Sequence, residues 1–189
     1  MKLSTRARYA LRVMLDIARH GGRETPVPLA AVALRTDLSH GYLEQLAMGL
    51  RRARLLRGVA GRKGGYLLGK DPSQIRIGAV VEASIGEVCL VECVRDPSLC
   101  ERAVRCETRA LYSLLNQRIE DTLQSLTLAD LMDEDWLAVH GGITPADLAT
   151  APDGPDPCST SHGPRRGRRR NRKTTPAPTG GAAERSPTG

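Results

Sequence analysis

Cysteine is the residue type whose spacing carries the clearest chemical signal in this sequence. Four of the five cysteines fall within eighteen residues, at Cys89, Cys93, Cys100 and Cys106. Thiolates are soft ligands for zinc and for iron–sulfur clusters, and a short loop can bring several of them to one centre. Arginines interleave with the cysteines and would stabilise thiolates by their positive charge. We therefore expect residues 89–106 to form a metal-binding or redox-active loop.

Several kinds of chemistry fit such a loop. An iron–sulfur cluster is our first hypothesis. A structural zinc site on four cysteines is a second, although no Cys-x-x-Cys pair is present and the intervals are unusual for zinc ribbons. Redox sensing by free thiols without metal is a third. A redox enzyme or cluster carrier is disfavoured, because no Cys-x-x-Cys accompanies a βαβ unit and the glycines of 61–65 lack the spacing of a phosphate-binding loop. We expect no enzymatic activity and no small-molecule substrate.

The composition indicates a globular domain with appendages. The chain has 189 residues and no apolar run long enough to cross a bilayer, so we expect a cytoplasmic protein without a membrane partner. A disulfide framework is then unfavourable, which strengthens the metal or redox interpretation of the cysteines. Phenylalanine is absent and aromatic residues make up 3%. The core must therefore be aliphatic, and stacking platforms for single-stranded nucleic acid are not expected.

The net charge of +7 is distributed unevenly along the chain. Residues 1–70 contain 14 Lys/Arg against 4 Asp/Glu, whereas residues 71–140 contain 6 against 13. The segments therefore carry +10 and −7, and the remainder adds +4. A basic segment joined to an acidic one favours a phosphate-binding head on a regulatory or assembly body.

The first seventy residues show the pattern of a helix-turn-helix. Ser4 is a plausible cap for a first helix that ends at Gly21-Gly22. A second helix is expected to begin at Pro28 and to carry Leu29, Val32 and Leu34. After a turn, Ser39 would cap a third helix with a buried face. The residues of that face are Leu43, Leu46, Ala47 and Leu50.

A β-hairpin follows the third helix. Residues 55–59 and 66–68 predict two short strands, and the glycines of 61–65 predict the turn between them. Arg62 and Lys63 would lie at its tip, where they could contact phosphate or a narrow minor groove. The expected fold is mainly α with a small two-stranded β wing: a winged helix-turn-helix plus a long dimerisation helix.

We expect this domain to bind a double-stranded DNA operator through the third helix and the wing. Gln45 could pair with adenine, Glu44 could accept from a cytosine amino group, and Arg51 and Arg52 could hold phosphates. Residues expected to be exposed on this helix are His40, Tyr42, Glu44, Gln45, Met48, Arg51 and Arg52. The candidate DNA-binding residues are Ser39, His40, Tyr42, Glu44, Gln45, Arg51, Arg52, Arg62 and Lys63.

Beyond the winged domain (1–70), a connecting strand and helix (71–88) lead into the cysteine loop (89–106). A long helix then starts at Glu107 within a segment (107–140) that ends in a C-terminal helix. The expected apolar stripe of the long helix consists of Leu111, Leu114, Leu115, Ile119, Leu123 and Leu126. A domain this small cannot cover that stripe, so we expect a homodimer. Residues 141–189, which include Cys158, are expected to be a disordered basic tail.

Several motifs together resemble those of the IscR-like iron–sulfur cluster regulators, which belong to the Rrf-two family of winged-helix transcription factors. They are MKLSTRARYALRVMLD at 1–16, VPLA at 27–30, YLEQL at 42–46, GGYLLGKD at 64–71 and the downstream cysteine loop. The resemblance covers roughly residues 1–132 and is specific, because these motifs agree in order and spacing.

The resemblance implies a homodimer that binds a near-palindromic operator, with a long helix crossing between subunits. It also implies a [2Fe–2S] or [4Fe–4S] cluster on three cysteines, which match Cys93, Cys100 and Cys106. Glu44 matches a position that helps to discriminate operator types. The regulator, preferentially a repressor, would then sense iron, cluster, redox or nitric-oxide status.

The chain departs from the family pattern at three positions. Arg109 stands where these regulators carry a histidine, three residues after the last cysteine. Arg8 stands where related nitric-oxide sensors have an acidic residue, and Ala60 replaces an arginine at the start of the wing turn. The fourth ligand is therefore open between Cys89, Glu107, a small molecule and a vacant position.

Overall fold

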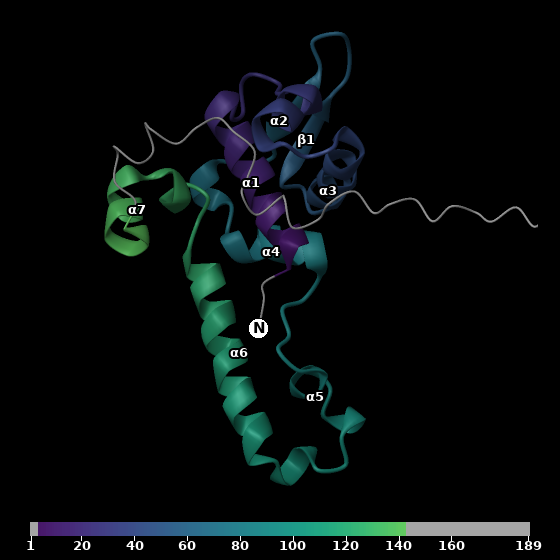
Figure 1. Ribbon diagram of the computed structural model, residues 1–189, viewed down its shortest axis with the longest axis vertical. Helices are drawn as coiled ribbons and strands as arrows, with labels where there is room; N and C mark the ends of the chain where they lie inside the picture. Colours follow the sequence, from purple (N-terminus) through teal and green to yellow (C-terminus); the bar gives the residue numbers. More distant parts are fainter. Residues whose placement is uncertain (1–3, 143–189) are drawn as a thin grey trace, which may run out of the picture. The chain divides into compact units, whose positions relative to one another are not determined.

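The computed structural model describes residues 4–142, and α-helices are its main element (Figure 1). The helices are α1 (Thr5–His20), α2 (Leu29–Thr36), α3 (His40–Arg52), α4 (Ile77–Ile85), α5 (Glu92–Arg95), α6 (Glu107–Ser125) and α7 (Glu134–Gly141). Short 3₁₀ turns are η1 (Pro72–Gln74), η2 (Pro97–Leu99), η3 (Ala103–Arg105) and η4 (Asp130–Met132). The strands are β1 (Leu56–Val59) and β2 (Gly65–Leu68). The predicted mainly helical fold with a two-stranded wing is confirmed.

Helix α1 has the predicted ends, with Ser4 before its first residue and Gly21 after its last. The Ser4 hydroxyl accepts a hydrogen bond from the Arg6 backbone N–H at 3.2 Å, which satisfies one of the free donors of the first turn. At the other end, the Gly21 N–H donates to the Ile17 carbonyl at 3.1 Å. The buried side is aliphatic apart from Tyr9, as expected for a protein without phenylalanine.

The turn between α2 and α3 corrects two details of the prediction. Pro28 is the residue before α2 rather than its first residue. Leu29 and Val32 are buried, but Leu34 is 85% exposed. At about 100° per residue, Leu34 lies some 200° around the helix from Val32 and faces away from the core. Ser39 caps α3 as predicted, and the four expected residues of the α3 face are buried.

The wing is an antiparallel hairpin anchored to the helical domain. Leu56 pairs with Leu68 and Val59 with Gly65, so the first strand begins one residue later than predicted. Tyr66 also exchanges two 2.9 Å backbone hydrogen bonds with Val27, in the segment before α2. These bonds make the base of the wing continuous with the helix-turn-helix and leave its tip free.

Helix α4 completes the core, because it packs against both α1 and α3 and contacts α6. Its two valines, Val80 and Val81, are fully buried among aliphatic residues of α1 and α3. The end of α6 is attached to the start of α4 by backbone hydrogen bonds. The Ile77 N–H donates to the Leu126 carbonyl at 2.9 Å, and the Leu128 N–H donates to the Ile75 carbonyl at 2.8 Å.

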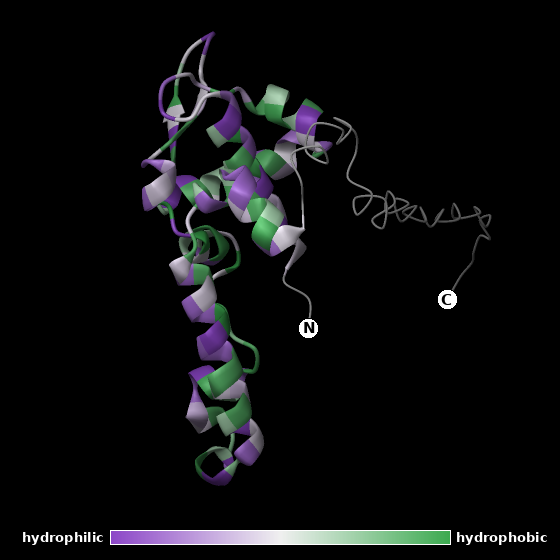
Figure 2. Ribbon diagram, turned by 90° about the vertical axis from the view of Figure 1, so that its left-hand side faces the viewer, coloured by the Kyte–Doolittle hydropathy of each residue, from purple (hydrophilic) through white to green (hydrophobic). Residues whose placement is uncertain are grey.

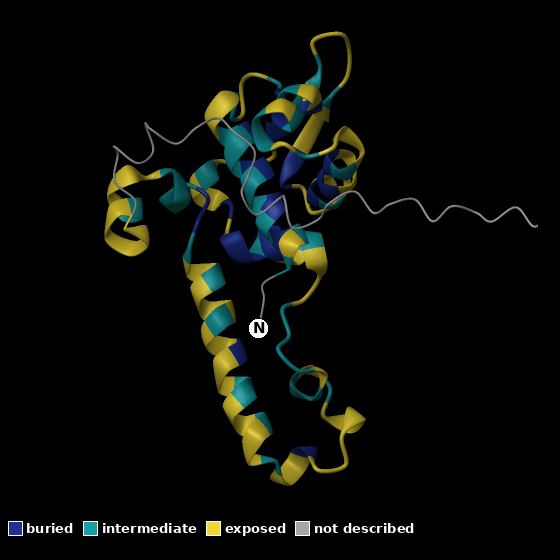
Figure 3. Cartoon of the chain, viewed as in Figure 1, coloured by how far each residue is buried: buried dark blue, intermediate teal, exposed yellow. Residues whose placement is uncertain are grey.

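Helix α6 does not carry the single apolar stripe that was predicted. Leu123 and Leu126 pack against the core. Leu111, Leu114 and Leu115 are 55%, 52% and 43% exposed, and most of α6 is exposed (Figure 3). Hydrophobic and hydrophilic stretches alternate along the helix (Figure 2). The apolar residues therefore divide between a core-facing end and an exposed leucine face, defined as Leu111, Leu114 and Leu115. None of the described helices is long and apolar enough to cross a membrane.

Candidate DNA-binding surface and cysteine loop

Most of the predicted DNA-reading residues share one exposed surface of α3. Ser39, His40, Glu44 and Gln45 are exposed at the beginning of this helix. The Ser39 hydroxyl accepts a 3.4 Å hydrogen bond from the Tyr42 N–H. The buried leucines of the opposite face hold the helix against the core. A polar helix face presented in this way has the geometry required for reading base edges in a major groove.

Tyr42 was predicted to be exposed, and the structure shows that it is only partly so. Its ring is partly buried and makes an edge-to-face contact with Tyr9, with centroids 6.0 Å apart and an interplanar angle of 86°. Burial raises the pKa of Tyr42, and the nearby Arg6 charge acts in the opposite direction. Tyr42 thus stays neutral at physiological pH and couples the start of α3 to α1.

Glu44 has a histidine neighbour on its own helix. His40 Nδ1 lies 3.6 Å from Glu44 Oε1, one turn away, and both side chains are more than half exposed. When His40 is protonated, this ion pair competes with a base or phosphate for the Glu44 carboxylate. His40 and Glu44, predicted as separate DNA contacts, therefore form a pair in the structure.

Arg51 and Arg52 are both exposed at the end of α3, but they do not have the same surroundings. The Arg51 guanidinium carbon lies 3.7 Å from where a Cβ on Gly58 of β1 would be, so Arg51 extends along the base of the wing. A Cβ at Gly58 would make only ordinary van der Waals contact with this arginine. Arg62 and Lys63 are exposed in the wing turn. That turn is closed by a 2.9 Å hydrogen bond from the Gly64 N–H to the Gly61 carbonyl.

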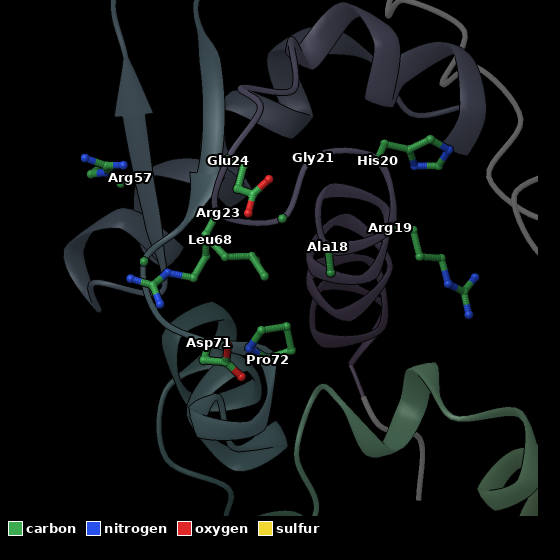
Figure 4. Close-up of a pocket in the computed structure, with 12 residues that line it drawn as sticks. Ala18, Arg19, His20, Gly21, Arg23, Glu24, Arg57, Leu68, Asp71 and Pro72 are labelled. Carbon is green, nitrogen blue, oxygen red and sulfur yellow. The ribbon is translucent and has the colours of Figure 1, made fainter.

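A polar hollow of about 960 Å³ lies beside the end of α1, away from these residues (Figure 4). Its lining includes the cations Arg19, Arg23 and Arg57 and the carboxylates Glu24 and Asp71. Hydrogen bonds from the Ser73 hydroxyl and N–H lower the pKa of Asp71, and Arg23 adds a smaller effect. The hollow contains none of the predicted DNA-binding residues and none of the cysteines.

The cysteine loop runs from the end of α4 to the start of α6 through a series of short turns. Cys89 donates its thiol to the Val91 carbonyl at 3.0 Å, and Cys93 lies on α5. Cys100 is exposed at the end of η2. Cys106 is the residue that caps α6, and its sulfur accepts a 3.3 Å hydrogen bond from the Arg109 N–H. Glu107, the other proposed fourth ligand, is exposed in the first turn of α6.

Asp96 shapes the middle of the loop. Its carboxylate accepts hydrogen bonds from the Ser98 hydroxyl at 2.6 Å and from the Ser98 N–H at 3.0 Å. These bonds lower the pKa of Asp96, so the carboxylate remains charged over the whole physiological range. The resulting cap positions η2 directly before Cys100.

The donor chemistry of the loop fits a thiophilic metal centre. Cys93, Cys100 and Cys106 supply three thiols that are at least partly exposed. Within residues 4–142, however, no three Cys, His, Asp or Glu side chains are close enough together to hold a metal ion. Arg109 points into the loop, where it donates to the Cys93 carbonyl at 2.9 Å and to the Ala103 carbonyl at 3.3 Å. The sequence indicated Arg109 as the replacement of a ligand and as one of the arginines near the thiolates, but not as a donor to these loop carbonyls.

The family model described as "Rrf2: Iron-dependent Transcriptional regulator" matches residues 3–134. The chain belongs to the Rrf2 family. Similar Rrf2 proteins include the HTH-type transcriptional regulator IscR of Serratia proteamaculans. It is 43% identical over 140 residues, covering 74% of this chain and 84% of the relative.

Solved structures agree with this assignment. CymR of B. subtilis, titled the global cysteine regulator, is 36% identical with a TM-score of 0.58, covering 69% of this chain and 95% of CymR. T. potens IscR is 34% identical with a TM-score of 0.57, covering 70% of this chain and 86% of that structure. The chain is a DNA-binding transcriptional regulator of the Rrf2 family with a winged-helix domain, as predicted. Its relatives are regulators, which agrees with the expectation that it is not an enzyme.

Proposed function

We propose that this regulator is a homodimeric repressor whose operator binding is controlled by an iron–sulfur cluster, [2Fe–2S] or [4Fe–4S], on Cys93, Cys100 and Cys106. The observation that carries this proposal is the position of Cys106, which belongs to the thiol set and also caps α6. A change at this sulfur acts directly on the first turn of the helix. The match to a family of iron-dependent regulators supports iron as the metal.

The DNA-binding side of the proposal uses the exposed start of α3 and the tip of the wing. Ser39, His40, Tyr42, Glu44 and Gln45 would lie toward the groove. Arg51, Arg52, Arg62 and Lys63 would hold phosphates on both sides of it. The net charge of +10 on residues 1–70 favours this surface for a polyanion.

The chain also provides a path from the loop to the head. Cys106 begins α6, and the other end of α6 is joined to α4 by the bond between Ile77 and Leu126. Helix α4 in turn packs against α3. A bound cluster would supply thiolate–iron bonds that form and break with iron and redox status. Ordering of the loop would bias the position of α6, and through α4 the position of α3.

The first test is the metal content of protein purified without oxygen. We expect a brown protein with matched iron and sulfide, and electron paramagnetic resonance would separate a two-iron from a four-iron centre. A colourless protein that resists anaerobic reconstitution would contradict the cluster. Stoichiometric zinc in such a protein would support a structural zinc site.

The second test asks whether the cysteines control DNA binding. Cys93, Cys100 and Cys106 are replaced together by Ala, and operator affinity is compared with and without reconstitution. We expect the difference between these two states to disappear, while Cys158→Ala, outside the loop, retains it. An undiminished response in the triple variant would rule out the mechanism. Cys89→Ala and Glu107→Ala then test the fourth ligand, since loss of cluster in either would identify it.

A thiol switch without metal is the second candidate function. The observation that favours it is the set of free, at least partly exposed thiols in the loop, which within residues 4–142 are not assembled into a metal-holding group. Metal-free protein that loses operator binding on oxidation and regains it with a thiol reductant would support this alternative.

A further inference from the structure

Two polar residues of α6 hold the cysteine loop by its backbone. Arg109 and Asn116 are seven residues apart, close to two helical turns, so their side chains share one face of α6. Both donate to or accept from backbone groups of residues 89–106. The exposed leucines of α6 lie on the other side of the helix, because Leu111 and Leu114 are rotated by about 200° and 140° from Arg109.

Arg109 joins two separate turns of the loop. Its Nε donates to the carbonyl of Cys93 on α5 at 2.9 Å, and its Nη1 donates to the carbonyl of Ala103 on η3 at 3.3 Å. These carbonyls lie on either side of Cys100 in the sequence. The guanidinium has several donors in a fixed planar fork, so one arginine can bind two carbonyls at once. The side chain is partly buried, which shields both hydrogen bonds from water.

Asn116 fixes the point where the chain enters the loop. Its Oδ1 accepts a 3.0 Å hydrogen bond from the Leu90 N–H, directly after Cys89. Its Nδ2 donates to the Glu120 carboxylate at 2.6 Å, which sets the orientation of the amide. Asn116 is only 7% exposed and is one of two buried polar side chains among the described residues. A buried amide with both ends satisfied is a specific contact rather than a solvated surface group.

Apolar contacts of the loop are limited. Ala103 is buried and Leu90, Val91 and Val94 are half-buried, whereas Leu99 and Val104 are 59% and 93% exposed. The remaining backbone hydrogen bonds of the loop are local, such as Val94 to Val91 and Cys100 to Pro97. Local turns do not tie a loop to another element. The hydrogen bonds that fix the position of this loop on α6 are therefore those of Arg109, Asn116 and the cap at Cys106.

We propose that Arg109 and Asn116 are positioning residues that clasp the cysteine loop onto α6 in the metal-free protein. Arg109 closes the loop around Cys100, and Asn116 anchors its entry. The clasp reduces the conformational freedom that the loop would lose when its thiols bind a common centre. It also transmits any movement of the loop to α6. The inference rests on the proposed function only for what the thiols bind, since the clasp needs no metal.

The test is amide hydrogen exchange in the full-length chain, reduced and treated with chelator, followed by mass spectrometry of peptides covering residues 89–106. Arg109→Ala is expected to accelerate exchange of loop amides at least about fivefold, because two charge-assisted hydrogen bonds are lost. Arg19→Ala, which removes an exposed arginine from the end of α1, outside both the loop and the exposed leucine face, is the matched control and is expected to leave loop exchange unchanged. Unchanged loop exchange in Arg109→Ala would overturn the proposal.

Arg109→Lys separates geometry from charge. Lysine retains the positive charge but cannot reach two carbonyls with a planar fork. We expect it to exchange as rapidly as Arg109→Ala, at least at residues 101–105. Full protection in the lysine variant would show that charge alone orders the loop and would contradict the clasp.

Asn116 is tested in the same way with two variants. Asn116→Ala removes the acceptor for the Leu90 N–H, so exchange at residues 89–91 is expected to rise. Asn116→Asp combined with Glu120→Gln retains the acceptor for the Leu90 N–H without placing two carboxylates side by side, so it should keep protection at Leu90. Equal exchange in both variants would refute the role of Asn116, and their circular dichroism spectra check that each variant is folded.

Iron and sulfide analysis of the same proteins separates this inference from the proposed function. A wild-type chain that never acquires a cluster would refute the cluster proposal, while the exchange data would still decide the clasp. Conversely, a cluster in wild-type protein with no change in loop exchange in Arg109→Ala would refute the clasp alone.

Discussion

Asp130 closes the connection between α6 and α7 through hydrogen bonds from a single residue. Its Oδ2 accepts from the Thr127 N–H at 2.7 Å and from the Thr127 hydroxyl at 2.8 Å. The backbone bond, then the hydroxyl bond, lowers the pKa of Asp130. Thr127 also pairs with Arg76 in the bridge that attaches this segment to the start of α4. The ionised carboxylate therefore supports the attachment of α6 to the head.

We predict that Asp130→Asn lowers the melting temperature by a few degrees at neutral pH. A carboxyl whose folded pKa is lowered contributes stability fully above its unfolded pKa of about 4, and that contribution is lost as pH falls through the folded value. The difference between wild type and variant should therefore shrink on acidification from about pH 7 to about pH 2. Asp121→Asn on the exposed side of α6 is the control. A difference independent of pH would contradict the assignment.

Gly65 lies so close to the backbone of Val27 that a side chain does not fit there. A Cβ at this position would meet the backbone of Val27, the residue that pairs with Tyr66. We predict that Gly65→Ala lowers the free energy of unfolding by roughly 1–3 kcal/mol, since the backbone cannot yield as a flexible side chain would. Gly41→Ala on α3 is the control, because no atom lies near its Cβ position. Denaturant titration would measure the free energy of unfolding of both variants. If Gly65→Ala were as stable as wild type, the wing could separate from Val27 at no cost.

At the scale of single elements, the wing tip should contribute affinity without sequence preference. Arg62 and Lys63 are exposed in the wing turn. Their neighbours are Ala60 and glycines, whose side chains cannot hydrogen-bond to a base. Replacing Arg62 or Lys63 by Ala should reduce the salt dependence of DNA binding by about one counterion per wing, equally for operator and unrelated DNA. Titrations at several salt concentrations measure this slope. Arg19→Ala at the end of α1, outside the predicted DNA-binding residues, should not change it. A loss confined to the operator would indicate base reading by the wing instead.

The elements that could be predicted from sequence are those determined by local interactions. Helices α1 and α3 begin at serine caps that bond to N–H groups two or three residues ahead, so a short segment specifies them. The hairpin likewise depends on the glycines of its own turn. These features require no information about distant parts of the chain.

The errors in prediction arose where distant elements decide the outcome. Leu34 is apolar like a core residue, but α1 and α3 contact the opposite side of α2 and leave Leu34 exposed. The leucines of α6 were assigned to one stripe because the position of α4, which covers only the end of that helix, was unknown. Arg109 could be recognised as a clasp only after the loop carbonyls were placed beside it.

At the scale of the whole molecule, we expect operator binding by the basic head to depend on pairing of two chains through the exposed leucine face of α6. Leu111, Leu114 and Leu115 remain 55%, 52% and 43% exposed in the single chain, an apolar surface that a second copy of α6 would cover. Two heads held together would then contact one operator simultaneously. A single head makes only half of those phosphate contacts.

We therefore predict that Leu114→Glu converts a dimer into a monomer in sedimentation experiments, because the new carboxylate would be buried without a partner. Leu34→Glu is the control, since Leu34 is even more exposed but lies on α2. Without the second head, operator affinity should fall at least about a hundredfold, while the salt dependence should drop to roughly half. If Leu114 acted on α3 within one chain, operator affinity would decrease while the slope of its salt dependence stayed unchanged. A monomeric wild type would refute the dimer. A slope reduced by about half, rather than by the single counterion expected for one wing-tip cation, is what distinguishes the loss of an entire head.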